Sequence, residues 1–360
     1  MKEALLYQKL DENKVQCNLC AHRCVINPSK KGICRVKENI SEILYTKAYG
    51  RTIAQNIDHI EKKPLYHFYP GSKAYSIATA GCNFHCRFCQ NWDISQITND
   101  EILKSGEKAS PGQIVLNAKQ SGCKNIAYSY TEATIFFEYS YDTARIAQKA
   151  GLNNIFITNG YMTTEMLEMI NPYLDAVNID LKAFRDETYR RIIGARLQPV
   201  LDNLKKIKQL GIWLEVTSLI IPGVNDDQYE IREMANFVAS ELGLDVPWYI
   251  SCFFPAYKMK EIPDTPLQTL QMAKKIGLEE GLNYVYLDNV KSDGDIYTKC
   301  PQCGYVLIDR SYFGMMKNNI QENHCPNCGR KIAGVGLSTK SFESKTEFEN
   351  TRKIIESDNF

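Results

Sequence analysis

The segment Gly81-Cys82-Asn83-Phe84-His85-Cys86-Arg87-Phe88-Cys89-Gln90-Asn91-Trp92 places three cysteines on one short loop, directly after a β-rich run. Three thiolates from one loop can hold a four-iron cluster and leave one iron without a protein ligand, and a catalytic metal site needs such an open position. Zinc, or a structural cluster with a distant fourth cysteine, is the alternative. The spacing, the preceding strand and the aromatic Phe88 favour a catalytic 4Fe–4S cluster bound by Cys82, Cys86 and Cys89.

Around this loop, from about residue 74 to residue 290, short β-rich runs alternate with amphipathic helical patterns. Repeated β–α units favour parallel strands joined by helical crossovers, and six or seven of them can form a partial barrel with its active site at the C-terminal strand ends. A doubly wound open sheet would give a similar pattern. The expected strands are 75–79, 125–130, 154–158, 176–181, 213–221, 248–253 and 284–287, and the helices include 112–120, 201–210 and 229–242.

The other cysteines gather mostly in two further places. Thirteen cysteines in a protein of a reducing compartment are typical of metal or redox chemistry and not of a disulfide framework. One group precedes the central loop and another follows the β–α region, whereas Cys123 and Cys252 stand alone and are expected to be small packed residues. The sequence therefore predicts three metal sites.

The C-terminal group consists of two matching turns, Cys300-Pro301-Gln302-Cys303-Gly304 and Cys325-Pro326-Asn327-Cys328-Gly329. Two such turns complete a tetrahedral all-thiolate shell, which is typical of a structural zinc site. The segment is too short for a hydrophobic core, so the metal would supply its folding energy. We predict a zinc ribbon with four ligands, and a rubredoxin-like iron site is the alternative. The ligands are Cys300, Cys303, Cys325 and Cys328.

The N-terminal group consists of Cys17, Cys20, Cys24 and Cys34, with His22 among them. Its spacing fits neither the bacterial nor the plant-type ferredoxin pattern. Zinc would hold the segment folded, whereas a second 4Fe–4S cluster could relay electrons, and the pattern leaves both open. His22 is expected beside the metal or at the surface and not as a ligand.

These features predict an α/β fold: a partial (β/α)6 TIM-like barrel with an N-terminal Cys-rich metal segment and a C-terminal zinc ribbon. We expect residues 1–72 to form the Cys-rich segment and a connector, and residues 73–290 to form the barrel. Residues 291–336 would form the zinc-ribbon-like domain, and residues 337–360 a polar tail.

Composition and charge exclude several classes of protein. The 43 Lys and Arg nearly balance the 42 Asp and Glu, whereas non-specific nucleic-acid binding needs an excess of positive charge. No apolar stretch approaches the length that crosses a bilayer, and the N-terminus shows no signal-peptide pattern. We therefore expect a cytoplasmic protein without membrane or nucleic-acid partners.

The Cys-x3-Cys-x-aromatic-Cys loop resembles the signature of the radical S-adenosylmethionine (radical SAM) superfamily. The likeness extends to the run Glu61-Lys62-Lys63-Pro64-Leu65-Tyr66-His67-Phe68-Tyr69-Pro70-Gly71-Ser72 and to Cys89-Gln90-Asn91-Trp92. Together these residues resemble the AmmeMemoRadiSam system radical SAM enzymes, relatives of the pyruvate formate-lyase activating enzymes. The resemblance covers nearly the whole chain.

The resemblance also implies cofactor-binding residues. It implies that Phe88 packs near the adenine of S-adenosylmethionine and that Glu132 accepts its methionyl ammonium, as a carboxylate facing a fixed cation can do. Further residues would contribute from the next strand ends, where a plain β–α turn and an internal salt bridge are the alternatives. They are Thr158 and Asn159, in the Thr-Asn-Gly turn, and Asp180 and Lys182.

Five positions depart from the pattern of the activating enzymes: Ala133, Ile157, Tyr249, Cys252 and Asp288. Tyr and Cys stand where that group tends to have His and Arg, which removes cationic donors. If these residues surround the substrate, the substrate is less anionic than that of the activating enzymes and is not a glycyl radical protein.

The predicted function is that of a radical SAM enzyme, an oxidoreductase that cleaves S-adenosylmethionine reductively and abstracts hydrogen from an unidentified substrate. That substrate would be a small molecule, a peptide or another biomolecule. A low-potential donor such as flavodoxin or ferredoxin would supply the electron. One alternative is an activating enzyme that installs a glycyl radical on a partner protein, and another is a non-catalytic iron–sulfur electron-transfer protein.

Overall fold

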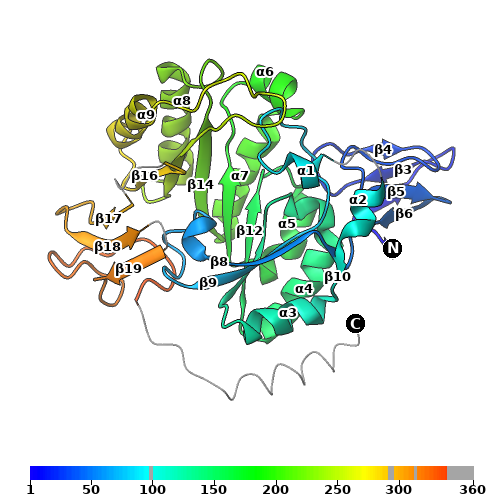
Figure 1. Cartoon of the computed structure of the whole chain (residues 1–360), viewed down its shortest axis with the longest axis horizontal. Coiled ribbons are helices and arrows are strands. Elements are labelled where there is room, and N and C mark those ends of the chain that lie inside the picture. Colours follow the sequence, from blue (N-terminus) through cyan, green and yellow to red (C-terminus); the bar gives the residue numbers. More distant parts are fainter. Residues whose placement is uncertain (97–99, 291–295, 312–313, 339–360) are drawn as a thin grey trace.

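The structure is a computed structural model that describes residues 1–96, 100–290, 296–311 and 314–338. A central unit of strands and helices carries a small β-rich unit from each end of the chain, on opposite sides in Figure 1. The polar tail predicted for residues 337–360 lies outside the described residues, apart from its first two positions, and so do residues 291–295 at the predicted start of the ribbon.

One sheet of eight strands forms the centre of the described chain, in the order β16-β15-β14-β13-β12-β11-β9-β8. All of its pairs are parallel except the antiparallel β8–β9 pair. Each parallel strand lies beside its successor in the sequence, and the order never reverses as it does in a doubly wound sheet. The predicted partial barrel is therefore confirmed. Its strands are β8 (Ala54–His59), β9 (Lys73–Ala78), β11 (Asn125–Tyr128), β12 (Asn153–Thr158), β13 (Ala176–Asp180), β14 (Trp213–Ile220), β15 (Trp248–Cys252) and β16 (Val285–Asp288).

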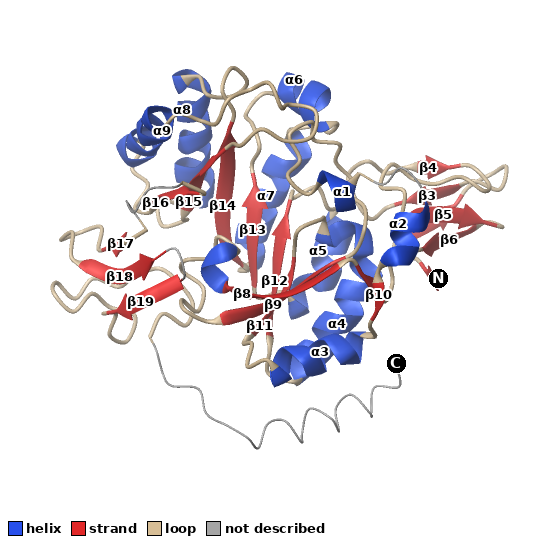
Figure 2. Cartoon of the chain, in the orientation of Figure 1, coloured by secondary structure: helices blue, strands red, loops and turns tan. Residues whose placement is uncertain are grey.

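Helices connect the parallel strands, as Figure 2 shows. Their ends follow local sequence signals: Ser110 caps α3 by accepting a hydrogen bond from the Gln113 amide at 3.2 Å, and Gly211 ends α7 with a left-handed φ of 76°. The helix expected at 229–242 is α8 continued by a π-helical turn, Val238–Leu242. The longer helices are α3 (Pro111–Gln120), α4 (Phe137–Lys149), α5 (Thr164–Ile170), α7 (Gln198–Leu210), α8 (Gln228–Phe237) and α9 (Leu267–Glu279), and the short ones are α1 (Trp92–Ser95), α2 (Asp100–Ser105) and α6 (Asp186–Thr188).

The N-terminal unit consists of small antiparallel sheets that pack against α4. Lys37 and Glu138 form an ion pair in which both side chains are fully buried, and Glu138 also accepts a hydrogen bond from the Leu5 amide at 2.9 Å. Tyr49 donates to Asp142, one turn farther along α4, at 2.7 Å. The strands are β1 (Lys2–Glu3), β2 (Tyr7–Lys9), β3 (Val15–Cys17), β4 (Val25–Ile26), β5 (Lys37–Ile40) and β6 (Ile43–Thr46), followed by the pair of β7 (Arg51–Thr52) and β10 (Glu107–Lys108).

We expect Glu138→Gln to destabilise the protein by about 3 kcal/mol, because it leaves the buried Lys37 ammonium without a counter-charge. Urea unfolding followed by circular dichroism measures this loss. The matched control is Glu12→Gln, which breaks an exposed pair with Lys14 and should change the stability far less. Equal effects of the two substitutions would show that the buried pair does not anchor the N-terminal unit.

The C-terminal unit is a three-stranded antiparallel sheet of β17 (Thr298–Lys299), β18 (Val306–Ser311) and β19 (Gly314–Asn318). It attaches to the barrel through buried side chains. Arg310 donates to the Tyr66 carbonyl at 2.7 Å and to Thr298 Oγ1 at 2.8 Å. His67 Nδ1 donates to the Ala333 carbonyl, also at 2.7 Å. The segment between η1 (Ile60–Lys62) and β9, which the sequence suggests to be a connector, thus joins the barrel to the ribbon.

Candidate functional site

One cavity of about 320 Å³ lies at the C-terminal ends of the parallel strands. All nine residues that the sequence assigns to the catalytic cluster and to S-adenosylmethionine are among those that line it. They come from the loops and strand ends after β9, β11, β12 and β13, which parallel pairing brings to one edge of the sheet. The nine are Cys82, Phe88, Cys86, Cys89, Glu132, Thr158, Asn159, Asp180 and Lys182.

Backbone hydrogen bonds fix the cysteine loop at the mouth of the barrel. The amides of His85 and Arg87 donate to the carbonyls of Ile193 and Ile192, both at 2.9 Å, in the π-helical turn Tyr189–Ile193. Beyond the loop, the Gln90 side chain donates to the Phe254 carbonyl at 2.8 Å. These contacts hold the three thiols in place before any metal binds.

The sulfurs of the central triplet are spread more widely than the ligands of a single metal ion. Among the described residues, the one group of three or more Cys, His, Asp or Glu side chains whose ligand atoms all lie within 4.8 Å of one another is the C-terminal set of cysteines. In an iron–sulfur cluster each thiolate binds a different iron, so the thiolates lie farther apart than around zinc. Burial raises the pKa of Cys82 and raises the pKa of Cys86 to about 12, so a bound cation is needed to keep these groups as thiolates. The loop therefore fits a cluster.

Glu132 is buried at the end of β11 and is held by four hydrogen bonds. Its Oε1 accepts from the Thr134 amide at 3.0 Å, from Thr134 Oγ1 at 2.6 Å and from Thr158 Oγ1 at 2.7 Å. Its Oε2 accepts from the Asn159 amide at 2.8 Å. Oε2 thus keeps acceptor capacity for a further donor. Burial raises the pKa of Glu132, although these hydrogen bonds oppose the shift.

We expect Glu132→Gln to lower both the affinity for S-adenosylmethionine and the stability without it, each by about 1–3 kcal/mol, since an amide nitrogen must face one of the donors. Anaerobic titration calorimetry and urea unfolding measure the two effects. The exposed Glu261 provides a control, and Glu261→Gln should change neither quantity. An unchanged affinity would leave Glu132 with a structural role alone.

Asp180 and Lys182 form an ion pair at the end of β13, with Lys182 Nζ donating to Asp180 Oδ2 at 2.8 Å. Burial alone would lower the pKa of Lys182, but Asp180 and Cys86 raise it above its ordinary value. The internal salt bridge that the sequence allows is thus present, and both side chains also line the cavity. Lys182 Nζ lies 5.9 Å from the centre of the Phe88 ring, so the pair stands beside the residue expected near adenine.

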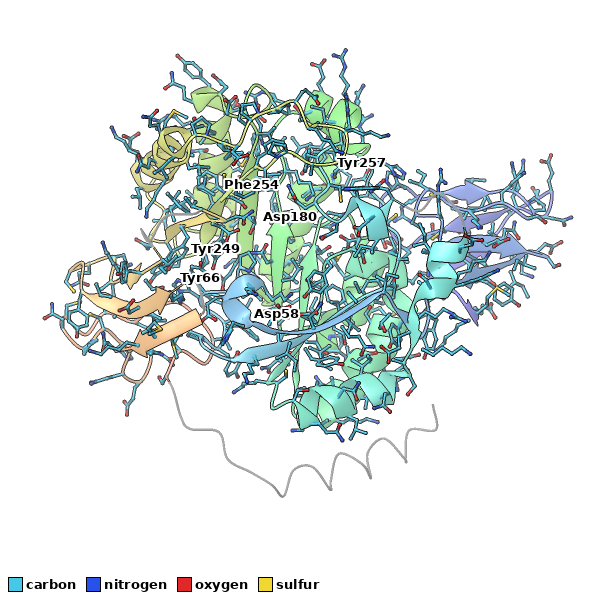
Figure 3. All side chains as sticks on the ribbon, viewed as in Figure 1. Asp58, Tyr66, Asp180, Tyr249, Phe254 and Tyr257 are labelled. Carbon is cyan, nitrogen blue, oxygen red and sulfur yellow. The ribbon has the colours of Figure 1, made fainter. Side chains whose placement is uncertain are left out.

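Lys63 lines the cavity, although the motifs assign it no role. Its side chain is almost fully buried, and its Nζ lies 2.8 Å from Asp58 Oδ2 and 4.2 Å from the centre of the Tyr130 ring. Burial lowers the pKa of Lys63, while Asp58 opposes the shift. Figure 3 marks Asp58 on β8, below Asp180 in this view, whereas Phe254 lies above Asp180. Lys63 and Tyr130 therefore form a polar part of the cavity wall, held by Asp58, that the motifs do not reveal.

The departures from the activating-enzyme pattern do not surround this cavity. Of the five, Ile157 is a lining residue, whereas Ala133, Tyr249, Cys252 and Asp288 are not among the lining residues. Cys252 is buried, with its thiol directed at the Phe253 carbonyl at 3.5 Å, which agrees with a packing role. The expectation that these five residues surround the substrate site is wrong. The departures therefore no longer support a less anionic substrate.

Tyr249 belongs to a buried polar group below the cavity, which we call the floor: Tyr66, His67, Glu215, Tyr249 and Tyr286. Tyr249 donates its hydroxyl to Glu215, and the Tyr66 amide donates to the Tyr249 hydroxyl at 2.8 Å. Glu215 also accepts from the amides of Tyr66 and His67, both at 3.0 Å. Figure 3 shows Tyr66 and Tyr249 side by side near the ribbon. Burial raises the pKa of Glu215 to about 7 despite these hydrogen bonds.

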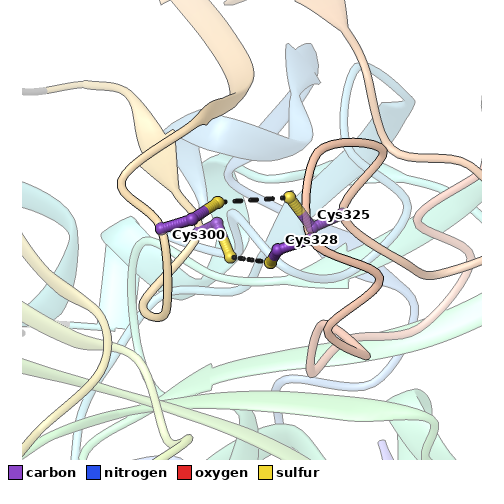
Figure 4. Close-up of side chains that lie close together, drawn as sticks. Cys300, Cys325 and Cys328 are labelled. Carbon is purple, nitrogen blue, oxygen red and sulfur yellow. Dashed lines mark hydrogen bonds between the residues drawn. The ribbon is translucent and has the colours of Figure 1, made fainter.

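The four C-terminal cysteines come together as predicted. The Sγ atoms of Cys300 and Cys328 lie 3.6 Å apart, and those of Cys303 and Cys325 lie 3.7 Å apart (Figure 4). Ligands at about 2.3 Å from a tetrahedral zinc ion are separated by about 3.8 Å. The arrangement could hold one metal ion and fits zinc.

The N-terminal cysteines surround a separate, small apolar cavity. His22 also lines it, and its Nε2 donates to the Asn83 carbonyl at 2.8 Å. This hydrogen bond places His22 between the N-terminal group and the central loop, in agreement with a place beside a metal. The lining cysteines are Cys17, Cys20, Cys24 and Cys34.

None of the helices in the described ranges is both long and apolar enough to span a membrane.

Comparison with known proteins identifies the family. The radical SAM superfamily profile matches residues 76–236. A protein of Methanocaldococcus jannaschii, described as uncharacterized, is 44% identical over 334 residues, which cover 92% of this chain and 99% of that protein. A pyruvate formate-lyase-activating enzyme of Clostridium pasteurianum is 25% identical over 164 residues, which cover 44% of this chain and 66% of that enzyme.

A solved radical SAM methyltransferase from Sphaerobacter thermophilus aligns with a TM-score of 0.47 at 15% identity, over 62% of this chain and 68% of that one. The family implies a 4Fe–4S cluster and S-adenosylmethionine as cofactors, together with a substrate and a reductant. Membership in this enzyme family also excludes the alternative of a non-catalytic iron–sulfur electron-transfer protein. The chain belongs to the radical SAM superfamily and is an enzyme.

Proposed function

We propose that this enzyme cleaves S-adenosylmethionine reductively and uses the resulting radical to abstract hydrogen from a substrate. The observation that carries the proposal is the meeting of all nine residues expected from the motifs in one cavity. When bound, the cluster supplies one electron that breaks the C5′–S bond, giving methionine and a 5′-deoxyadenosyl radical. The substrate is a small molecule, a peptide or another biomolecule.

The residues divide this task between them. Cys82, Cys86 and Cys89 would hold the 4Fe–4S cluster, which would supply the electron for S-adenosylmethionine cleavage. Glu132 accepts the ammonium through Oε2, because its other oxygen already accepts three hydrogen bonds. Phe88 packs beside the adenine. The floor closes the barrel below and limits the entry of water, which would compete for a reactive intermediate.

The decisive experiment is anaerobic reconstitution with iron and sulfide, reduction with dithionite, and chromatography for 5′-deoxyadenosine and methionine. We expect both products in equal amounts, formed only when the reductant and S-adenosylmethionine are both present. A reduced cluster that binds S-adenosylmethionine and releases neither product would contradict the proposal.

A second candidate is the installation of a glycyl radical on a partner protein. It is favoured by the similarity to a pyruvate formate-lyase-activating enzyme. The test incubates the reduced enzyme with glycyl radical proteins and looks for a backbone glycyl doublet by electron paramagnetic resonance (EPR). A doublet that requires both this enzyme and S-adenosylmethionine would establish activation, and its absence would leave hydrogen abstraction from another substrate.

A further inference from the structure

Local backbone contacts bring the N-terminal cysteines together around their cavity. The Cys17 amide donates to the Cys24 carbonyl at 2.9 Å, so the end of β3 and the start of β4 bring two of the cysteines together. A Cβ atom on Gly32 would lie 3.2 Å from Ile26 Cδ1 and 3.6 Å from Cys24 Sγ. Gly32 thus lets the segment that carries Cys34 approach the same space.

The distances between these sulfur atoms distinguish a site for an iron–sulfur cluster from a site for a single metal ion. The ribbon provides an internal comparison, because its sulfurs reach 3.6 and 3.7 Å, as zinc requires. No three cysteines of the N-terminal group in the described chain satisfy the 4.8 Å limit that the ribbon meets, and neither does the central triplet. The N-terminal group therefore resembles the central cluster site and not the zinc site.

A buried donor also points into this region. Asn83 lines the N-terminal cavity and is fully buried, and its Nδ2 has no hydrogen-bond partner among the described residues. An unsatisfied buried amide is costly, whereas the sulfur atoms of an iron–sulfur cluster accept hydrogen bonds. The Asn83 side chain is fixed from its other end, because Oδ1 accepts from Asn159 Nδ2 at 2.8 Å.

Asn83 links the two cysteine sites directly. It follows Cys82 in the chain, and its carbonyl accepts the hydrogen bond from His22. Thr134 lies between the two cavities. It lines the N-terminal cavity, and it donates a hydrogen bond to Glu132, which lines the large cavity. Ile33 lines the N-terminal cavity and is 41% exposed, so this site also lies close to the surface.

We propose that Cys17, Cys20, Cys24 and Cys34 hold a second 4Fe–4S cluster that relays electrons to the central site. One electron from a reduced ferredoxin or flavodoxin reduces the N-terminal cluster and then passes by way of Asn83 to the cluster of the Cys82 loop. The donor is oxidised by one electron, no bond is made or broken, and no proton is transferred. The relay rests on the proposed function, whereas the presence of the cluster does not.

The first test uses the full chain with Cys82→Ala, Cys86→Ala and Cys89→Ala combined, reconstituted anaerobically. We expect about four iron and four acid-labile sulfide atoms per chain, the content of one 4Fe–4S cluster, and an EPR signal on reduction that S-adenosylmethionine does not shift. A second zinc in place of iron, or no metal at the N-terminal site, would overturn the proposal.

The second test keeps the central loop and combines Cys20→Ala with Cys24→Ala. Iron should fall from about eight to about four atoms per chain, and the remaining signal should still shift with S-adenosylmethionine. Unchanged iron would refute the site. Cys123→Ala is the matched control, because this buried cysteine lies outside all three groups, and it should keep the full iron content.

The relay is tested by comparing reductants in the Cys20→Ala and Cys24→Ala variant. Dithionite should support 5′-deoxyadenosine formation near the wild-type rate, whereas reduced ferredoxin should support it several-fold more slowly. Equal rates with ferredoxin in the variant and in the wild type, or an equal loss with both reductants, would refute the relay. If the wild type itself forms no product with dithionite, the proposed function fails, and the iron content still decides whether the second cluster exists.

Discussion

Replacing Cys82, Cys86 and Cys89 together by Ala is expected to reduce 5′-deoxyadenosine formation to background. The loop supplies every thiolate expected for the central cluster, and no other cysteine lines the large cavity in the described part of the chain. The measurement is product chromatography after anaerobic reduction, together with the EPR shift that S-adenosylmethionine causes. Product formation by this variant at the wild-type rate would refute the assignment.

The same triple variant should remain folded, so its loss of product formation would result from the loss of the cluster and not from unfolding. The loop is held by backbone hydrogen bonds from His85 and Arg87, and these do not depend on the thiols. Its circular dichroism spectrum should match that of the wild-type protein prepared without iron. Cys252→Ala is a suitable single-site control, because this buried cysteine is not among the residues that line the cavity, and it should retain cleavage.

The second large effect is expected at the ribbon. Cys303→Ala or Cys328→Ala should abolish zinc binding and lower the melting temperature, because zinc contributes roughly 10–16 kcal/mol to the folding of small zinc-finger peptides. Zinc analysis and thermal unfolding measure the two quantities. A variant with full zinc content and an unchanged melting temperature would show that the ribbon does not depend on this ligand set.

Cys123→Ala serves as the control for the ribbon as well. It removes a buried thiol that belongs to none of the cysteine groups, so it should keep its zinc and lose only the packing of one small side chain. A chelator should reproduce the ribbon phenotype in the wild type and have no further effect on the melting temperature of Cys303→Ala.

The strands and the cofactor-binding edge could be predicted because both follow from local patterns. Buried parallel strands appear in the sequence as short apolar runs, and their C-terminal ends meet at one edge, so residues after β9, β11, β12 and β13 had to converge. Lys63 could not be found this way. Its place in the cavity depends on the antiparallel β8, which brings Asp58 beside it.

Tyr249 shows a second limit of sequence reasoning, which concerns depth inside the barrel. Alternate residues of a strand face the same side, so Tyr249 and Ser251 of β15 both point inward. Ser251 lines the cavity, whereas Tyr249 lies one layer deeper and bonds to Glu215. A motif comparison identifies the inward side but not the layer, and the layer decides whether a residue meets substrate.

Through Arg310, the C-terminal ribbon is hydrogen-bonded to the base of the barrel and helps to close it. A fragment ending at residue 290 would lack Arg310, Thr298 and Ala333, so the Tyr66 carbonyl, the Tyr286 hydroxyl and His67 Nδ1 would each lose a bonding partner. The ribbon therefore covers the base of the barrel. A chain that stops before the ribbon would leave the base of the barrel without these hydrogen-bond partners and would open the floor to solvent.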